Sequence, residues 1–263
     1  MAKIESYAPG SFCWAELATT DPAAAKQFYS DMFGWNALDL PMPEGVYTLF
    51  QVDGNDAAAA CNAQPGVPNH WGLYFSVTSA DDSAAQVSQA GGKIIAGPFD
   101  AHDYGRMAIA QDPEGAVFSL WQAKRSIGAT YGGPLGQVMW PELMSADPER
   151  AAAFYTRLFG WQTKPETGIA EAQYTEWQHG GRSMGGLLPM KGDQWKGVPP
   201  HWSMYVTVAD CDERAARATQ LGGKLYMPPT DIPNVGRFSV IADPQGAAFN
   251  IIHLTTTHQP AAA

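Results

Sequence analysis

Residues 14–35, WAELATTDPAAAKQFYSDMFGW, return as residues 140–161, WPELMSADPERAAAFYTRLFGW, at an offset of 126 (140 − 14). Later matches keep the same order at an offset of 131 (201 − 70), among them His70-Trp71 with His201-Trp202 and Asp112-Pro113 with Asp243-Pro244. Self-similarity at a fixed period indicates a duplicated structural unit. The second copy therefore carries five additional residues (131 − 126) between Trp161 and His201.

The duplication predicts two tandem domains. We place the first domain at residues 1–125 and the second at residues 135–257, with a linker at 126–134 and a tail at 258–263. Glycine and proline gather in the linker, where they favour turns over regular structure. These linker residues are Gly128, Gly132, Gly133 and Pro134.

Each quoted stretch opens with a predicted strand and continues into a helix. Asp21 is a good N-cap, Pro22 suits the first helical position, and Gly34 is typical of a helix end. Asp147-Pro148 to Gly160 repeats this pattern. A second helix in each copy is predicted at Asp82–Ala90 and at Asp212–Leu221, each closed by two glycines.

Short apolar runs between and after the helices predict strands. In the first copy they are Val46–Val52, Leu73–Val77, Lys93–Ala96, Arg106–Ala110 and Ala116–Trp121. Each copy then contains two βαβββ modules. The predicted fold class is α+β, a tandem duplication of a paired βαβββ domain.

Two motifs carry a resemblance to a known family. They are the Asp-Pro helix start that leads to Phe-Tyr-x-x-x-Phe-Gly-Trp, and the late Asp-Pro-x-Gly before the last strand. Both resemble the vicinal oxygen chelate superfamily of glyoxalase I, extradiol dioxygenases and bleomycin-resistance proteins, and the bacterial two-domain glyoxalase-like members in particular. The resemblance covers residues 10 to 253 and implies a curved mixed sheet that forms a half-barrel cavity in each copy. It does not choose a reaction, because the superfamily hosts lyases, oxygenases, isomerases and pure binding proteins.

Enzymatic members of that superfamily hold a divalent metal on His, Gln or Glu side chains of the strands. The equivalent positions here are Trp14 and Trp140, Gly72 and Ser203, Ser119 and Asn250, and the segments 57–60 and 184–187. An indole N–H only donates a hydrogen bond, and glycine offers no side-chain ligand. We therefore expect metal-free cavities and no cofactor. The alternative is that His70 and His201, two residues earlier on the same strand face, act as ligands.

Strand alternation places Glu16 on the same face as Trp14, and Glu142 on the same face as Trp140. A carboxylate on an inward face needs a partner. In one reading each glutamate binds a cationic or hydroxyl-bearing ligand, or serves as a general base. In the other reading the partners are arginines, Glu16 with Arg106 and Glu142 with Arg237, although an arginine there also suits a ligand anchor.

Aromatic residues are dense enough to line a cavity for a flat, partly apolar ligand, but each of them equally suits a packed core. Besides the residues below, Trp71, Tyr174, Trp177 and Trp202 belong to this set. The predicted ligand-binding residues are Trp14, Glu16, Tyr47, His70, Tyr74, Arg106 and Trp121 in the first copy, and Trp140, Glu142, His201, Tyr205, Arg237 and His253 in the second.

Composition restricts the partners. The chain has 16 basic and 26 acidic residues, a net charge of −10, which is the wrong sign for binding nucleic acid or an anionic membrane. The same excess of acid favours a cationic ligand. Three scattered cysteines and an N-terminus without an apolar run predict a cytoplasmic location.

We expect a protein that binds or sequesters a small organic molecule, either cationic or aromatic. The alternative is an enzyme of the same superfamily, either a glyoxalase-like lyase or an oxygenase or hydroxylase. The sequence assigns no catalytic residue. Both a monomer and a homodimer remain open.

Overall fold

The structure is a computed structural model that describes residues 3–42, 45–166 and 173–255. The predicted tail at 258–263 lies outside the described residues. No helix in the described part has the length and apolar character needed to cross a membrane.

The first copy forms one eight-stranded sheet in the order β2-β3-β4-β1-β5-β8-β7-β6, with two helices. Its elements are β1 (Phe12–Thr19), α1 (Pro22–Phe33), β2 (Asn36–Met42), β3 (Gly45–Val52), β4 (Asn55–Asn62), β5 (His70–Ser76), α2 (Ala80–Gln89), β6 (Lys93–Ala101), β7 (Gly105–Gln111) and β8 (Val117–Ala123).

The second copy repeats this order as β10-β11-β12-β9-β13-β16-β15-β14. Its elements are β9 (Val138–Ser145), α3 (Pro148–Phe159), β10 (Gln162–Pro165), β11 (Thr175–His179), β12 (Arg182–Pro189), the 3₁₀ turn η1 (Asp193–Trp195), β13 (His201–Thr207), α4 (Cys211–Gln220), β14 (Lys224–Ile232), β15 (Gly236–Ala242) and β16 (Ala248–Leu254).

Within each module the first and last strands pair in parallel and the remaining neighbours pair in an antiparallel manner, and the two modules of a copy meet in an antiparallel pair. β1 pairs with β4 in parallel and with β5 in an antiparallel manner, and β5 pairs with β8 in parallel. The second copy uses the same pairings between β9, β12, β13 and β16. The predicted α+β class and the tandem duplication of paired βαβββ modules are confirmed, with curved sheets that do not close into barrels.

The helices start and stop where the predicted signals lie. The Asp21 carboxylate accepts a hydrogen bond from the Ala24 N–H at 3.0 Å, and Gly34 ends α1 with a φ of 69°. α2 begins at Ala80, two residues earlier than predicted, because Ser79 is the N-cap and accepts from the Asp82 N–H at 3.1 Å. Strand β6 extends beyond the predicted Ala96 to Ala101 across two irregularities in its pairing with β7.

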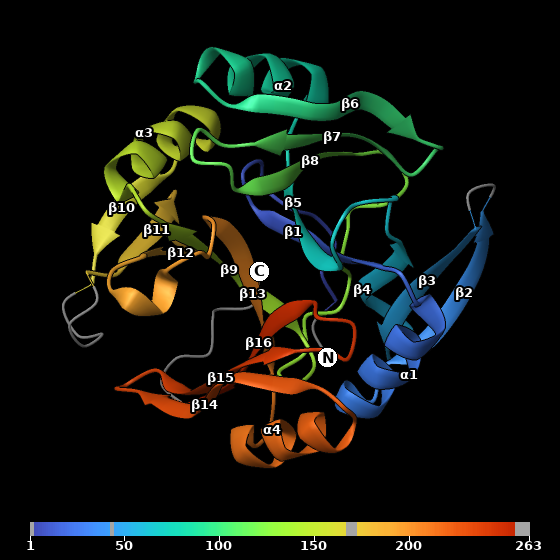
Figure 1. Cartoon of the computed structure of the whole chain (residues 1–263). Helices are drawn as coiled ribbons and strands as arrows, with labels where there is room; N and C mark the ends of the chain where they lie inside the picture. Colours follow the sequence, from blue (N-terminus) through green and yellow to red (C-terminus); the bar gives the residue numbers. More distant parts are fainter. Residues whose placement is uncertain (1–2, 43–44, 167–172, 256–263) are drawn as a thin grey trace.

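The two copies share one core. Figure 1 shows α1 beside α4 and α2 beside α3, with β1, β5, β9 and β13 near the centre. Phe75 of the first copy is fully buried against Trp202 of the second, with ring centroids 5.0 Å apart. Trp71, Trp177 and Trp202 lie in this joint core.

Reciprocal hydrogen bonds also join the copies. The Tyr29 hydroxyl donates to Asp243 at 3.1 Å, and the Tyr155 hydroxyl donates to Asp112 at 3.0 Å. The other oxygen of Asp112 accepts from backbone N–H groups of its own turn, including that of Ala116 at 2.9 Å. The repeated Asp-Pro-x-Gly motif therefore both closes a turn and connects one copy to the other.

The additional residues of the second copy fall mostly in one loop. Strand register matches Ala59 with Gly186, an offset of 127, whereas His70 matches His201 at 131. Four of the five inserted residues (131 − 127) therefore lie between β12 and β13. This loop, residues 190–200, contains η1.

Candidate functional site

Glu16 lies on the helix-free face of the first sheet, the face opposite α1 and α2. Its neighbours Ala15 and Leu17 point to the other face and join the core that contains both helices. The Tyr47 hydroxyl donates to Glu16 Oε2 at 2.6 Å, and the Tyr74 hydroxyl donates to Oε1 at 2.9 Å. Burial raises the pKa of both tyrosines well above the ordinary value, and the charge of Glu16 raises it further. Both hydroxyls therefore remain donors at neutral pH.

Three further side chains surround this first site. Trp14 Nε1 donates to the Tyr47 hydroxyl at 3.2 Å, so the indole orients the tyrosine that binds the carboxylate. Cys61 Sγ lies 3.6 Å from Glu16 Oε1. Trp121 stands at an edge-on angle to Tyr74, with ring centroids 6.2 Å apart, and its indole donates to the Ser126 carbonyl at 3.0 Å.

The second copy reproduces the same arrangement around Glu142. The Tyr174 hydroxyl donates to Oε1 at 2.8 Å and the Tyr205 hydroxyl donates to Oε2 at 2.9 Å. Trp140 Nε1 donates to the Tyr174 hydroxyl at 2.8 Å. We call the two groups the Glu16 cluster (Trp14, Glu16, Tyr47, Tyr74) and the Glu142 cluster (Trp140, Glu142, Tyr174, Tyr205).

The predicted pairing of these glutamates with arginines is wrong. Arg106 makes a two-pronged contact with Asp81 of α2, from Nε at 2.6 Å and from Nη2 at 2.8 Å. Arg237 binds Asp212 of α4 in the same way. Both arginines project toward the helices, on the face of the strand opposite the clusters. Among the described residues, Glu16 and Glu142 have no cationic partner.

The two carboxylates differ in their access to solvent. Glu142 is buried, with 5% of its surface exposed, whereas Glu16 is only half-buried. Burial raises the pKa of Glu142 above its ordinary value, and the hydrogen bonds from Tyr174 and Tyr205 oppose that shift. Glu16 is therefore the more exposed of the two residues.

The raised pKa of Glu142 gives a pH-dependent expectation. The folded chain keeps the Glu142 proton at a pH where the unfolded chain has lost it, so stability falls as pH rises from about 4.3 through the folded pKa. Glu142→Gln removes this term. We expect the melting temperature of wild type, relative to E142Q, to fall over that pH range in differential scanning calorimetry. A constant difference between the two proteins would contradict a shifted Glu142.

The predicted histidines bond to backbone carbonyls and not to a residue of either cluster. His70 Nδ1 is 2.8 Å from the Pro68 carbonyl, and His201 Nδ1 is 2.8 Å from the Pro199 carbonyl. His253 is exposed, with Nδ1 3.3 Å from the Val208 carbonyl. The structure thus brings together the predicted tryptophans, tyrosines and glutamates, but it brings neither the histidines nor the arginines to them.

The donor set does not fit a divalent metal. The Glu16 cluster offers one carboxylate, whose oxygens already accept from two phenols, and Glu16 lies in register with Ala59 and Gly72, which carry no ligand atom. In the part of the chain that the structure describes, no group of three His, Cys, Asp or Glu side chains is placed to hold a metal ion.

Sequence reasoning missed two residues of these sites. A lone cysteine gives no sequence pattern that points to Cys61, although its position two residues past Ala59 on β4 places it on the face of Glu16. Gly186 lies opposite Glu142, and a Cβ there would stand 1.7 Å from the Tyr174 hydroxyl oxygen. A side chain at position 186 would therefore force Tyr174 to move.

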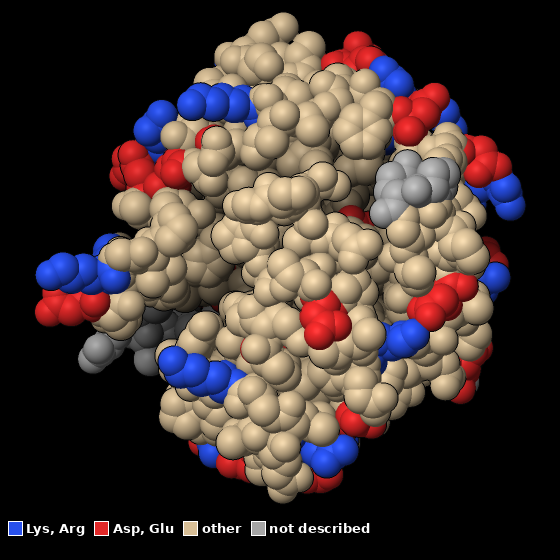
Figure 2. Space-filling view, turned by 45° about the vertical axis from the view of Figure 1, so that its right-hand side comes forward, with Lys and Arg blue, Asp and Glu red and all other residues tan. Residues whose placement is uncertain are grey.

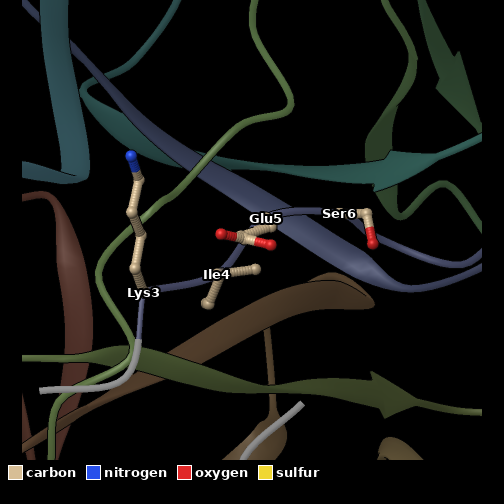
Figure 3. A pocket seen from close by; sticks show the side chains of 4 residues that line it. All are labelled: Lys3, Ile4, Glu5 and Ser6. Carbon is tan, nitrogen blue, oxygen red and sulfur yellow. The ribbon is translucent and has the colours of Figure 1, made fainter.

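A separate pocket of about 220 Å³ lies along the N-terminal segment. Lys3, Ile4, Glu5 and Ser6 line it (Figure 3). Ile4 N–H donates to the Thr130 carbonyl at 2.9 Å, so the pocket lies where the N-terminal segment meets the predicted linker. Figure 2 shows one face of the molecule on which most charged side chains lie near the periphery.

Comparison with known proteins matches both copies to one family. The family model described as "Glyoxalase/Bleomycin resistance protein/Dioxygenase superfamily" matches residues 11–120 and again residues 135–251. The Mn(II)-bound glyoxalase of Novosphingobium aromaticivorans has a similar fold, with a TM-score of 0.64 over 93% of this chain and 82% of its own, at 17% identity. At that identity the likeness shows the fold alone.

Two curated relatives match over nearly the whole chain. The Mycobacterium tuberculosis protein named "Putative glyoxylase CFP32" is 39% identical over 260 residues, 96% of this chain and 98% of the relative. The Streptomyces peucetius protein named "Anthracycline biosynthesis protein DnrV" is 35% identical over 277 residues, covering 98% of each chain.

Proposed function

The chain belongs to the glyoxalase/bleomycin resistance protein/dioxygenase superfamily, and from the cluster that it carries we propose that it binds a small organic cation with a planar aromatic body, without a metal. The observation that carries this proposal is Glu16, a half-buried carboxylate that receives two phenol hydrogen bonds and has no cationic partner among the described residues. A partly buried carboxylate without a cationic partner favours the binding of a positively charged ligand.

Aromatic side chains around Glu16 support the rest of the ligand description. Trp14, Tyr74 and Trp121 lie in one buried cluster on the helix-free face. Aromatic faces attract cations and stack on flat rings, so one site offers a partner to each part of such a ligand. The name of DnrV ties that relative to the biosynthesis of anthracyclines, which are planar aromatic compounds.

We expect Glu16→Gln to weaken binding of doxorubicin, a fluorescent anthracycline with a protonated amine, by about tenfold to a hundredfold. A hydrogen bond to a charged group contributes about 1.5–3 kcal/mol, and the neutral amide loses that charge. The melting temperature should stay within about 3 °C of wild type, because the amide oxygen still accepts from one tyrosine. Fluorescence titration measures the affinity. The aglycone without the amino sugar is the matched control, and it should respond weakly to E16Q.

The second candidate function is an enzyme, a lyase or oxygenase of the same superfamily. The name of the mycobacterial relative favours it, as does the partial exposure of Glu16, which would let the carboxylate act as a general base. Turnover of methylglyoxal with a thiol cofactor, abolished in E16Q, would establish the lyase.

A further inference from the structure

The Glu142 cluster has no part in the function proposed for the first copy, yet it holds the same chemistry. Glu142 accepts from two tyrosine hydroxyls, as Glu16 does, and it has no cationic partner among the described residues. Phe238 packs on Tyr205 with ring centroids 6.2 Å apart and adds an aromatic wall. What separates the two sites is access, because Glu142 is 5% exposed.

The two copies also differ in the loop that follows this part of the sheet, residues 190–200 in the second copy. It has eleven residues, whereas its counterpart in the first copy, residues 63–69, has seven. Lys191 Nζ donates to Gln173 Oε1 at 2.5 Å, and Gln173 directly precedes Tyr174, whose hydroxyl binds Glu142. The longer loop is therefore fastened to the segment that leads into the Glu142 cluster.

The same loop is built to move. Gly192 and Gly197 flank η1 with φ values of 92° and 82°, a backbone region that glycine enters without strain. Most of the loop is exposed, and only Met190, Trp195 and Pro200 are partly buried. Besides the Lys191 contact, its side chains make a hydrogen bond from Gln194 to the Lys191 carbonyl and a ring contact between Trp195 and His201. Segments with so few contacts open at low cost.

We propose that the Glu142 cluster is a second binding site for the same class of planar organic cation, and that residues 190–200 form the lid that controls entry to it. This inference rests on the function proposed above. The first site fills directly, and the second fills only when the Lys191–Gln173 contact opens. The duplicated chain then carries one open and one gated site.

The test is stopped-flow binding of doxorubicin to the full chain carrying Glu16→Gln, at doxorubicin concentrations too low to fill the weakened first site. We expect this variant to retain slow binding of about one equivalent. Replacing residues 190–200 by residues 63–69 of the same chain should raise the association rate on the order of tenfold, because the open fraction sets the rate. Lys191→Ala, which should fold without difficulty, should raise the rate about twofold to fivefold, the range expected for one surface contact.

Glu142→Gln distinguishes a failure of the second site from a failure of the function proposed for the first. Added to E16Q, it should abolish the slow binding, and on its own it should leave the fast binding at the first site. If E142Q binds one equivalent while E16Q binds none with either loop, the gated site is refuted and the function of the first copy stands. If E142Q also binds none, the proposed function fails as well. Equal association rates with the long and the short loop would refute the lid.

Discussion

Replacing Gly186 by alanine should lower the free energy of unfolding by about 2–4 kcal/mol, because it breaks the Glu142 cluster from within. The added Cβ would lie 1.7 Å from the Tyr174 hydroxyl oxygen, a separation that forces the ring away from Glu142. The buried carboxyl then loses one of its two donors. Urea denaturation followed by circular dichroism measures the loss.

A double-mutant cycle tests whether contact with Tyr174 causes the loss of stability in Gly186→Ala. Tyr174→Phe removes the oxygen that the new Cβ would strike, so Gly186→Ala should cost less in the Y174F protein than in wild type. The first copy has Ala59 at the equivalent position and keeps the Tyr47–Glu16 hydrogen bond, so the expected cost at Gly186 depends on where Tyr174 lies. If G186A were equally costly in both backgrounds, contact with Tyr174 would not be the reason for glycine at this position.

Phe75→Ala should cost about 3–5 kcal/mol, the usual loss for truncating a fully buried phenylalanine. Phe75 has no exposed surface, and it packs on Phe159, Trp161 and Trp202 of the other copy with ring centroids 5.4, 5.6 and 5.0 Å away. Because this core belongs to both copies, we expect F75A to shift a single transition of the whole chain. Tryptophan fluorescence and far-UV circular dichroism should report the same midpoint.

Phe99→Ala is the matched control for this prediction. Phe99 lies on β6 with 43% of its surface exposed, so its truncation should change the free energy of unfolding by about 1 kcal/mol or less. Two separate transitions in F75A, with the second copy unfolding as in wild type, would show that the copies are independent folding units.

The sequence predicted the elements of both sites because strand alternation and helix-end signals occur at matching positions in the two copies. Alternation along β1 and β9 places Trp14 with Glu16 and Trp140 with Glu142, and the structure has both pairs on one face. The helix ends followed from local signals such as Asp21 and Gly34. Those features depend on neighbours within a few residues.

Partners distant in sequence could not be predicted in the same way. The arginine pairing failed because recurrence in both copies does not say to which face of β7 Arg106 points, and Asp81 on α2 is 25 residues away. The sequence shows the length of the insertion, but the hydrogen bond from Lys191 to Gln173 depends on how two segments meet in the folded chain. The difference in exposure between Glu16 and Glu142 therefore required the structure.

The most direct test of metal-free binding at Glu16 is a doxorubicin titration of wild type and E16Q after dialysis against EDTA. We expect saturable binding by wild type without added metal, an affinity of the fast-filling site about tenfold to a hundredfold lower in E16Q, and no change when Mn(II) is added. Binding that appears only with Mn(II), or that is equal in the two proteins, would contradict a metal-free site built on this carboxylate.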